Sequence, residues 1–297
     1  MKKRMLNAGV FQGNLLLVNG SYPLRAACGR EDLVPVAAQY PKALLKREAA
    51  CYLRLLLSRV GGLSCIVPVS GYRPAQEQAE IYENSLAQNG EDFTQKYVAR
   101  PCCSEHQTGL AIDLGLKKSA HDKIDFLCPD FPYDGICAQF RRYAPQYGFV
   151  ERYPKGKEAL TGIAHEPWHF RYTGYPHSLF ISQNDLCLEE YVAFLKGFSQ
   201  ENPLRLPARG KTVTAYYVPA GGESAGLPSP NRAGRPGWPG QTSAAARFDC
   251  SDYAVCSGCS SCSVCSVCSS GGGYFARQVS GNNVDGFIVT LWGKGNE

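Results

Sequence analysis

"SEHQTGLAIDLG", residues 104–115, places a histidine and an aspartate seven positions apart, at His106 and Asp113. Gly109 lies between them, and a glycine can adopt backbone conformations that let the chain bend sharply. The apolar residues around Asp113 predict a strand over residues 110–116. A loop histidine and a strand carboxylate would then converge. This pair either holds a metal ion, or it is only a loop residue and a residue of the ordinary core strand that follows the loop.

A second stretch, "HEPWHFRY" at residues 165–172, adds two histidines and an acid. A catalytic zinc ion usually takes three protein ligands, drawn from histidine and carboxylate, and keeps a fourth position for water. His106, Asp113 and His169 would supply such a set, although other divalent ions also suit these ligand types. Glu166 would remain as the base that takes a proton from that water.

Strand geometry bears on whether Glu166 can serve the same cavity as His169. Positions three apart on a regular strand point to opposite faces. Pro167 breaks that regularity because it cannot donate to a ladder, so both side chains can turn to one side. His165 shares strand parity with His169, which leaves it open as a supporting residue or a competing ligand. The two other histidines are interpreted as structural or surface residues: His121 and His177.

Composition and charge limit the function classes. The chain has 297 residues, of which 44% are hydrophobic and 19% charged, with a formal charge of +5. This is a globular composition of one or two domains, with no basic run that would favour nucleic acid. "MKKRM" at the start is not followed by a long apolar stretch, and no stretch approaches the roughly 18 apolar residues of a spanning helix. We therefore expect a cytoplasmic protein without a transmembrane anchor.

The pattern along the chain predicts an α+β fold rather than a doubly wound sheet, because helices and strands alternate without a regular βαβ repeat. Helices are expected over residues 41–60, 74–89, 134–145 and 184–198, and strands over 64–73, 110–116 and 165–172. Proline and glycine punctuate several of these elements, with Gly90 expected to end the second helix.

The composition changes after Pro207. Strands are expected over residues 211–218, 273–279 and 286–292, the last two joined by a hairpin loop. Between them, residues 221–273 are mostly Gly, Ser, Ala, Pro and Cys, which predicts a flexible insertion. We therefore expect a catalytic domain over residues 1–204 and a small β segment carrying that insertion over residues 205–297.

The 14 cysteines fall into two groups. Eight are scattered through the first 187 residues and are interpreted as buried thiols rather than a disulfide framework. The other six lie between residues 250 and 268, including "CSGCSSCSVCSVC" (256–268). This run has the C-x-x-C spacing of metal ligands, but no second unit is set apart by a longer loop and no histidine lies nearby. Low-complexity sequence is the favoured interpretation, with opportunistic metal binding as the alternative.

The two histidine stretches together resemble the zinc-dependent D-alanyl-D-alanine peptidases of the VanY and VanXY type. The pattern Ser-x-His-x-x-Gly-x-Ala-x-Asp followed by Glu-x-x-His is present in residues 104–113 and 166–169. "SGYRPAQEQ" (70–78) is similar to the family's arginine-bearing turn, and "GNLLLVNGSYPL" (13–24) to its opening. The resemblance implies the hedgehog/D,D-peptidase fold, with a central antiparallel sheet flanked by helices.

The resemblance also implies roles for individual residues. His106, Asp113 and His169 would bind one zinc ion, with Glu166 as general acid and base. Arg73 would stabilise the developing oxyanion. Three further residues would line the substrate site: Ser104, Gln78 and Trp168. Simpler interpretations stay open for Arg73 as a surface turn residue, Ser104 as a loop cap and Trp168 as core packing.

The function implied by the resemblance is hydrolysis of the D-Ala–D-Ala bond, either in the free dipeptide or at the end of a peptidoglycan stem peptide. A link to glycopeptide resistance is one expectation, and routine wall metabolism is another. One alternative is a zinc-bearing binding module of the hedgehog type that does not hydrolyse anything. Another is a peptidase of the same fold with L,D- or endopeptidase specificity. The sequence does not indicate the oligomeric state.

Overall fold

The structure is a computed structural model that describes residues 10–26, 28–117, 119, 123–208, 211–220 and 276–294. All the elements below belong to one compact unit formed from both sides of residues 221–273. The predicted insertion, the cysteine run and His121 lie outside the described residues. No helix within the described ranges has both the length and the apolar character needed to cross a membrane.

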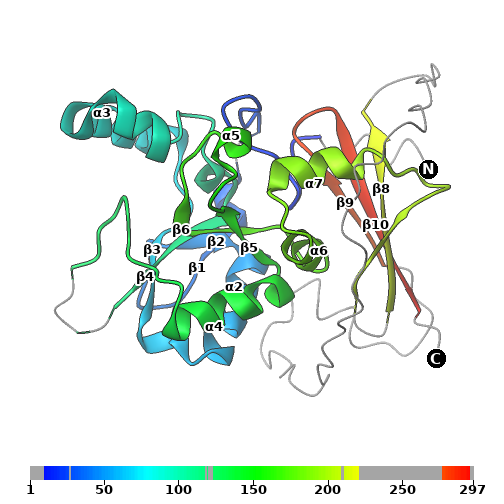
Figure 1. The fold of residues 1–297 in the computed structure, drawn as a ribbon, viewed down its shortest axis with the longest axis horizontal. Coiled ribbons are helices and arrows are strands. Elements are labelled where there is room, and N and C mark those ends of the chain that lie inside the picture. The colour runs from blue at the N-terminus through cyan, green and yellow to red at the C-terminus, as the bar shows by residue number, and fades with distance from the viewer. Residues whose placement is uncertain are drawn as a thin grey trace. The chain divides into compact units, whose positions relative to one another are not determined.

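A four-stranded antiparallel sheet forms the centre of the fold, and its strand order is β3-β4-β6-β5 (Figure 1). Its strands are β3 (Ile66–Ser70), β4 (Ala111–Leu116), β5 (Phe149–Tyr153) and β6 (Glu166–Tyr172). All neighbouring strands pair antiparallel. The expected α+β fold with a central antiparallel sheet is therefore confirmed.

The two faces of this sheet differ in chemistry, because side chains alternate along each strand. Helices α2 (Arg47–Arg59) and α4 (Gly135–Tyr143) cover one face, where Ile112 and Phe170 join a large apolar cluster. Each large apolar side chain buried there contributes roughly 1.5–3 kcal/mol. The neighbouring positions Asp113 and His169 point to the opposite face, so buried polar groups gather there.

Several predicted boundaries differ from the structure. The helix expected from residue 41 begins only at Arg47, because β2 (Leu44–Lys46) precedes it and pairs with β1 (Leu33–Pro35). Helix α3 (Ala75–Tyr97) continues past Gly90, which interrupts it at φ 80° and ψ 175° without ending it. The helix expected over residues 184–198 is α7 (Leu188–Leu195), preceded by the unpredicted α6 (His177–Gln183).

The remaining short elements connect these parts. They are the 3₁₀ helices η1 (Arg30–Asp32), η2 (Gly62–Ser64), η3 (Glu105–Thr108) and η4 (Ala144–Tyr147), and the one-turn helix α5 (Glu158–Thr161). Helix α4 passes into η4 at about the place where Pro145 was expected to end it.

A second antiparallel sheet has the order β7-β8-β10-β9. Its strands are β7 (Leu204–Leu206), β8 (Lys211–Pro219), β9 (Ala276–Gly281) and β10 (Gly286–Lys294). Helices α6 and α7 lie between this sheet and the central one (Figure 1). Leu15, Val150, Tyr191 and Ile288 share an apolar cluster there, which joins the N-terminal segment and the central sheet to the second sheet.

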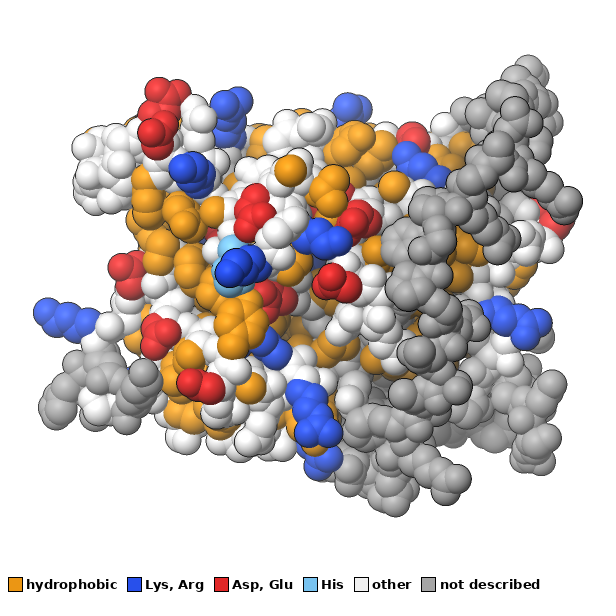
Figure 2. Space-filling view, viewed as in Figure 1, with side chains coloured by type: hydrophobic (Ala, Val, Ile, Leu, Met, Phe, Trp, Pro, Cys, Tyr) orange, Lys and Arg blue, Asp and Glu red, His pale blue; other side chains and the backbone are white. Residues whose placement is uncertain are grey.

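The expectation of buried thiols is only partly right. Cys51, Cys137 and Cys187 are buried, whereas Cys102 is exposed and the other four described cysteines are partly exposed. None of these eight cysteines forms a disulfide. On the face drawn in Figure 2, acidic and basic side chains of described residues are interspersed, and no single basic patch forms among them.

Candidate metal centre

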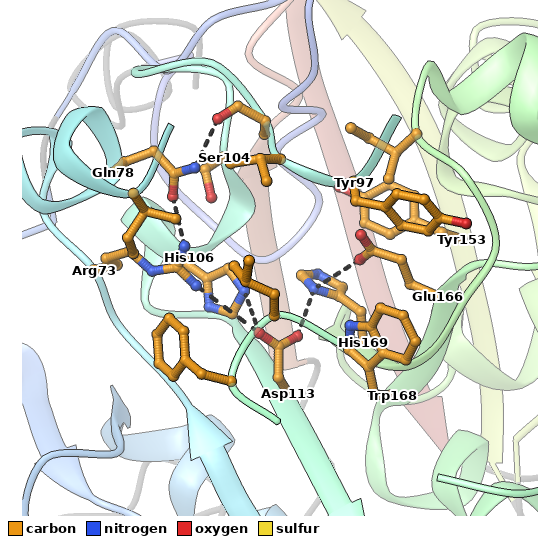
Figure 3. Close-up of a pocket in the computed structure, with 16 residues that line it drawn as sticks. Arg73, Gln78, Tyr97, Ser104, His106, Asp113, Tyr153, Glu166, Trp168 and His169 are labelled. Atoms are coloured by element: carbon orange, nitrogen blue, oxygen red, sulfur yellow. Dashed lines mark hydrogen bonds and ion pairs between the residues drawn. The ribbon is translucent and has the colours of Figure 1, made fainter. Parts of the chain in front are cut away.

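Three side chains from separate segments meet on the polar face of the central sheet (Figure 3). Asp113 Oδ2 lies 3.0 Å from His106 Nε2, and Asp113 Oδ1 lies 2.9 Å from His169 Nδ1. One ligand atom from each residue lies within 4.8 Å of the others, and all three residues are buried. The structure therefore brings together the three residues that the sequence suggested as ligands.

Strand register explains two of the three positions. Asp113 on β4 pairs directly with His169 on β6, so their side chains project to the same face. His106 comes from η3, and the chain turns into β4 at Gly109, where φ is 68°. This left-handed φ favours glycine, and a Cβ added at Gly109 would also displace the end of the Leu33 side chain, 2.7 Å away. The predicted bend between His106 and Asp113 is thus present.

The turn after β3 fixes the ring of His106. Gly71 lies so close to the backbone of Leu44 that an added Cβ would be 2.4 Å from the Leu44 carbonyl oxygen. Its own carbonyl oxygen accepts a hydrogen bond of 2.7 Å from His106 Nδ1. A carbonyl oxygen can only accept, so Nδ1 carries the proton and Nε2 is free to ligate.

Arg73 leaves the same turn and points into the site. Its Nη1 donates to Gln78 Oε1 and its Nη2 to Ser70 Oγ, both at 2.9 Å. Gln78 is anchored in turn by donating to the Ala99 carbonyl at 2.6 Å. Arg73 is only 7% exposed, so the interpretation as a surface turn residue is wrong. Its Nε is buried without a partner, and burial lowers the pKa of the guanidinium.

Glu166 lies in the same cavity as the three candidate ligands, as predicted from the distortion of the strand at Pro167. Its Oε2 lies 3.7 Å from His169 Nδ1, and the register of β5 against β6 shifts opposite Pro167. Arg141 holds this distortion by donating from Nη2 to the Pro167 carbonyl at 2.6 Å. Burial raises the pKa of Glu166 to about 8, with Asp113 adding to the rise.

The cluster around Asp113 has a pronounced electrostatic pattern. Burial opposes the charged form of Asp113, but His106 and His169 hold the pKa of that carboxyl well below its usual range. Burial would lower the pKa of His169, yet the Asp113 carboxylate raises it to about 9. Burial lowers the pKa of His106. A full negative charge is thus kept at the centre of the site.

The surrounding pocket contains every residue that was expected to line it. Ser104 is 3% exposed and begins η3 without a side-chain cap, so the loop-cap interpretation is not supported. Trp168 both packs in the apolar core and lines the pocket, so its two interpretations hold together. Other lining residues were not anticipated, and they are mainly apolar and aromatic: Ile81, Tyr97, Val98, Phe126, Leu127, Tyr153 and Ile163.

Two other histidines have different surroundings. His165 Nε2 is hydrogen-bonded to Tyr133 Oη at 2.7 Å and does not join the cluster. His177 is buried and bonded to Tyr191 Oη and Thr290 Oγ1, so it links α6, α7 and β10. The interpretation of His177 as structural is confirmed.

Sequence reasoning missed Glu105, which lies within the opening motif. Its side chain is fully buried, and its Oε1 lies 2.7 Å from both Arg152 Nε and Arg171 Nη1. Its Oε2 faces His169 Nε2 at 3.7 Å. The arginines are distant in sequence, so only the charge of Glu105 beside a candidate ligand could have drawn attention to it.

The donor set fits a small divalent cation. Two imidazole nitrogens and a carboxylate oxygen match the three protein ligands of a catalytic zinc site. Asp113 Oδ1 is buried and makes no hydrogen bond of good geometry, as expected of an atom prepared for another partner. Among the described residues, His106, Asp113 and His169 form the group of histidine and acidic side chains whose ligand atoms lie close enough together to hold a metal ion.

The chain is similar to known D-alanyl-D-alanine peptidases. The family model VanY, described as D-alanyl-D-alanine carboxypeptidase, matches residues 44–175. The bifunctional D-Ala-D-Ala dipeptidase and D-Ala-D-Ala carboxypeptidase VanXYC of Enterococcus gallinarum is 41% identical over 181 residues, which make up 61% of this chain and 94% of that protein.

Two solved structures are also similar. The vancomycin resistance D,D-dipeptidase VanXYg, in complex with a D-Ala-D-Ala phosphinate analogue, aligns with a TM-score of 0.74 and 43% identity over 95% of each chain. The LD-carboxypeptidase LdcB aligns with a TM-score of 0.51 and 35% identity, over 60% of this chain and 84% of that one.

Proposed function

The chain belongs to the VanY family of D-alanyl-D-alanine carboxypeptidases, and on that premise we propose that it hydrolyses the D-Ala–D-Ala bond at the metal centre described above. The observation that carries the proposal is the position of Glu166. Its carboxylate lies 3.7 Å from a candidate metal ligand inside a buried pocket, with Arg73 also lining that pocket. Such an arrangement supplies a base and a cation to one reacting carbonyl.

His106, Asp113 and His169 would hold the ion through Nε2, a carboxylate oxygen and Nδ1. Zinc is the proposed ion because of this His₂Asp donor set. When bound, it supplies Lewis acidity that polarises a carbonyl group and makes a water molecule easier to deprotonate. Both imidazoles would ligate in their neutral form, so a proton held on the ligating nitrogen of His169 would leave as the ion binds.

Glu166 would take the proton from the attacking water and deliver it to the departing amine of the terminal D-alanine. Its buried position suits that exchange, because burial disfavours the charged carboxylate and makes its proton easier to hold. Arg73, held by Ser70 and Gln78, would stabilise the negative charge that develops on the carbonyl oxygen.

Ser104, Gln78 and Trp168 would contact the substrate, because all three line the pocket. Gln78 would act mainly by holding Arg73 in place. The apolar residues beside them suit the methyl groups of alanine. We assign the reaction to residues 1–204, which contain every one of these side chains.

The test is release of D-alanine by the full chain from free D-Ala-D-Ala and from a stem pentapeptide ending in it, with and without a chelator. We expect release from at least one substrate, its loss with chelator and its return with Zn²⁺. Release that chelator does not change would contradict the proposed centre. A protein that binds zinc stoichiometrically yet releases no amino acid would instead favour a binding module.

Because the chain is similar to the LD-carboxypeptidase LdcB, cleavage of an L,D-peptide bond should be compared with cleavage of the D,D-bond. A tetrapeptide with an L,D-terminal bond belongs in the same panel, and its preferential cleavage would replace the D,D assignment.

The cytoplasmic location expected from the sequence remains a prediction that cell fractionation would check. The link to glycopeptide resistance remains one as well, to be checked by comparing resistance with and without the active protein.

A further inference from the structure

Two buried polar atoms face each other beside the metal centre, and neither has a hydrogen-bond partner. They are Glu105 Oε2 and His169 Nε2, which lie 3.7 Å apart. Leaving either atom unpaired in the interior costs free energy, and more for a charged group. A fold retains such a pair when the two atoms serve each other or a ligand.

The position of Glu105 is fixed by two buried arginines. Arg152 Nε and Arg171 Nη1 both approach Oε1 at 2.7 Å, which leaves Oε2 pointing at His169. Glu105 is therefore placed as an acceptor for that ring.

Arg152 also connects this acceptor to the C-terminal part of the fold. Its Nη1 and Nη2 donate to the two carboxylate oxygens of Glu189, on α7, at 2.8 and 2.6 Å. Two carboxylates and two guanidinium groups thus form a neutral, mostly buried cluster. Glu189 shares Arg152 with Glu105, and it also accepts a hydrogen bond from Asn19 Nδ2.

The two histidines of the metal centre use opposite ring nitrogens. His106 turns Nε2 toward Asp113 and donates from Nδ1 to the Gly71 carbonyl. His169 turns Nδ1 toward Asp113 and Glu166, so its Nε2 faces Glu105. In metal sites the ring nitrogen that does not ligate usually donates to a carbonyl or carboxylate, which fixes the tautomer and the ring orientation.

We propose that Glu105 is a positioning residue for the metal centre. It accepts the Nε2 proton of His169 and so keeps Nδ1 as the metal-ligating atom, while Arg152 and Arg171 hold Glu105 in place. This inference rests on the proposed metal site and adds to it the support of one ligand by a buried carboxylate.

The competing role is purely structural, in which Glu105 only neutralises Arg152 and Arg171. Glu189→Gln is the matched control, because it removes one negative charge from the same arginine without touching His169. A structural role would make Glu105→Gln and Glu189→Gln similar in every property apart from overall stability. A positioning role separates them in metal binding.

The first measurement is Zn²⁺ affinity of the full chain by competition with a chromophoric chelator. We expect Glu105→Gln to bind zinc about 10- to 100-fold more weakly than the wild type. Glu189→Gln should keep near wild-type affinity. Equal affinity in wild type and Glu105→Gln would overturn the proposal, as would equal weakening in both variants.

The second measurement needs no variant and so holds even if Glu105→Gln does not fold. Nitrogen-15 NMR of the histidine rings in zinc-loaded wild type should show His169 protonated at Nε2 and His106 protonated at Nδ1. A His169 ring protonated at Nδ1 would overturn the proposal. If the wild type takes up no zinc, the proposed metal site itself is wrong. This outcome differs from a zinc-loaded protein in which the His169 ring has the other tautomer.

Discussion

Two buried histidine environments in this molecule differ in whether their hydrogen bonds are complete. His177, between α6, α7 and β10, has both ring nitrogens bonded to hydroxyl groups, at 2.6 and 2.8 Å, and burial lowers its pKa to about 3. At the metal centre, His106 and His169 converge on Asp113, and buried polar atoms there lack partners.

The contrast separates a structural histidine from the two proposed metal ligands. A buried polar group with satisfied hydrogen bonds contributes modestly to stability, whereas an unsatisfied one costs free energy. Around Asp113 the central sheet therefore contains a small region that lowers the stability of the fold. Such a region is explained if a bound cation satisfies the ligand atoms gathered there.

The largest expected difference between the two environments is in metal content. His169→Ala removes one of three ligands, so bound zinc and D-alanine release should both be lost. His177→Ala should keep one zinc per chain and lose about 1–3 kcal/mol of unfolding free energy, because the hydroxyls of Tyr191 and Thr290 are left unpaired. Metal analysis by mass spectrometry and denaturant unfolding measure the two quantities. One zinc ion per chain in His169→Ala would show that His169, like His177, is not a metal ligand.

A smaller effect is expected at Arg73, whose Nη2 lies 3.9 Å from Asp113 Oδ2 but which is not itself a candidate ligand. Arg73→Ala should reduce kcat/KM by about 10²- to 10³-fold, because one fixed donor to the developing oxyanion is lost. Zinc content should stay at one per chain. Gln78→Ala removes one hydrogen bond from the arginine and keeps its charge in the site, so this graded variant should lose less activity. If both variants are as active as wild type, Arg73 has no role in the reaction.

The smallest effect is a pH dependence that belongs to the structural histidine. The folded pKa of His177, about 3, lies below the unfolded value near 6.5, so the unfolded chain binds the additional proton between these values. Its contribution is therefore complete at neutral pH and falls as pH decreases. Between pH 6 and pH 5, wild type should lose about 1 kcal/mol more unfolding free energy than His177→Gln.

Urea unfolding of both proteins at the two pH values checks this. Identical losses in the two proteins would mean that His177 does not stay neutral in the folded state.

Part of the fold and site followed from local sequence patterns. Apolar alternation marked β4 and β8, and Gly109 and Pro167 marked the places where the chain had to depart from regular geometry. Because these signals act within a few residues, they were enough to suggest that His106, Asp113, His169 and Glu166 converge.

Other features depended on contacts between distant segments. Glu105 acts through Arg152 and Arg171, and no local pattern pairs these residues. Residues 44–46 look helical by composition but are extended because β1 pairs with them. Gly90 carried the signal of a helix end, yet α3 resumes after a single non-helical residue.

The central claim is that Glu166 moves the proton while His106, Asp113 and His169 hold the ion. The most direct measurement compares D-alanine release by wild type and Glu166→Gln, each with one zinc per chain established beforehand. We predict that the variant retains zinc and loses about 10²- to 10⁴-fold in turnover, the usual contribution of a general acid and base. A zinc-loaded Glu166→Gln that turns over at the wild-type rate would contradict the account.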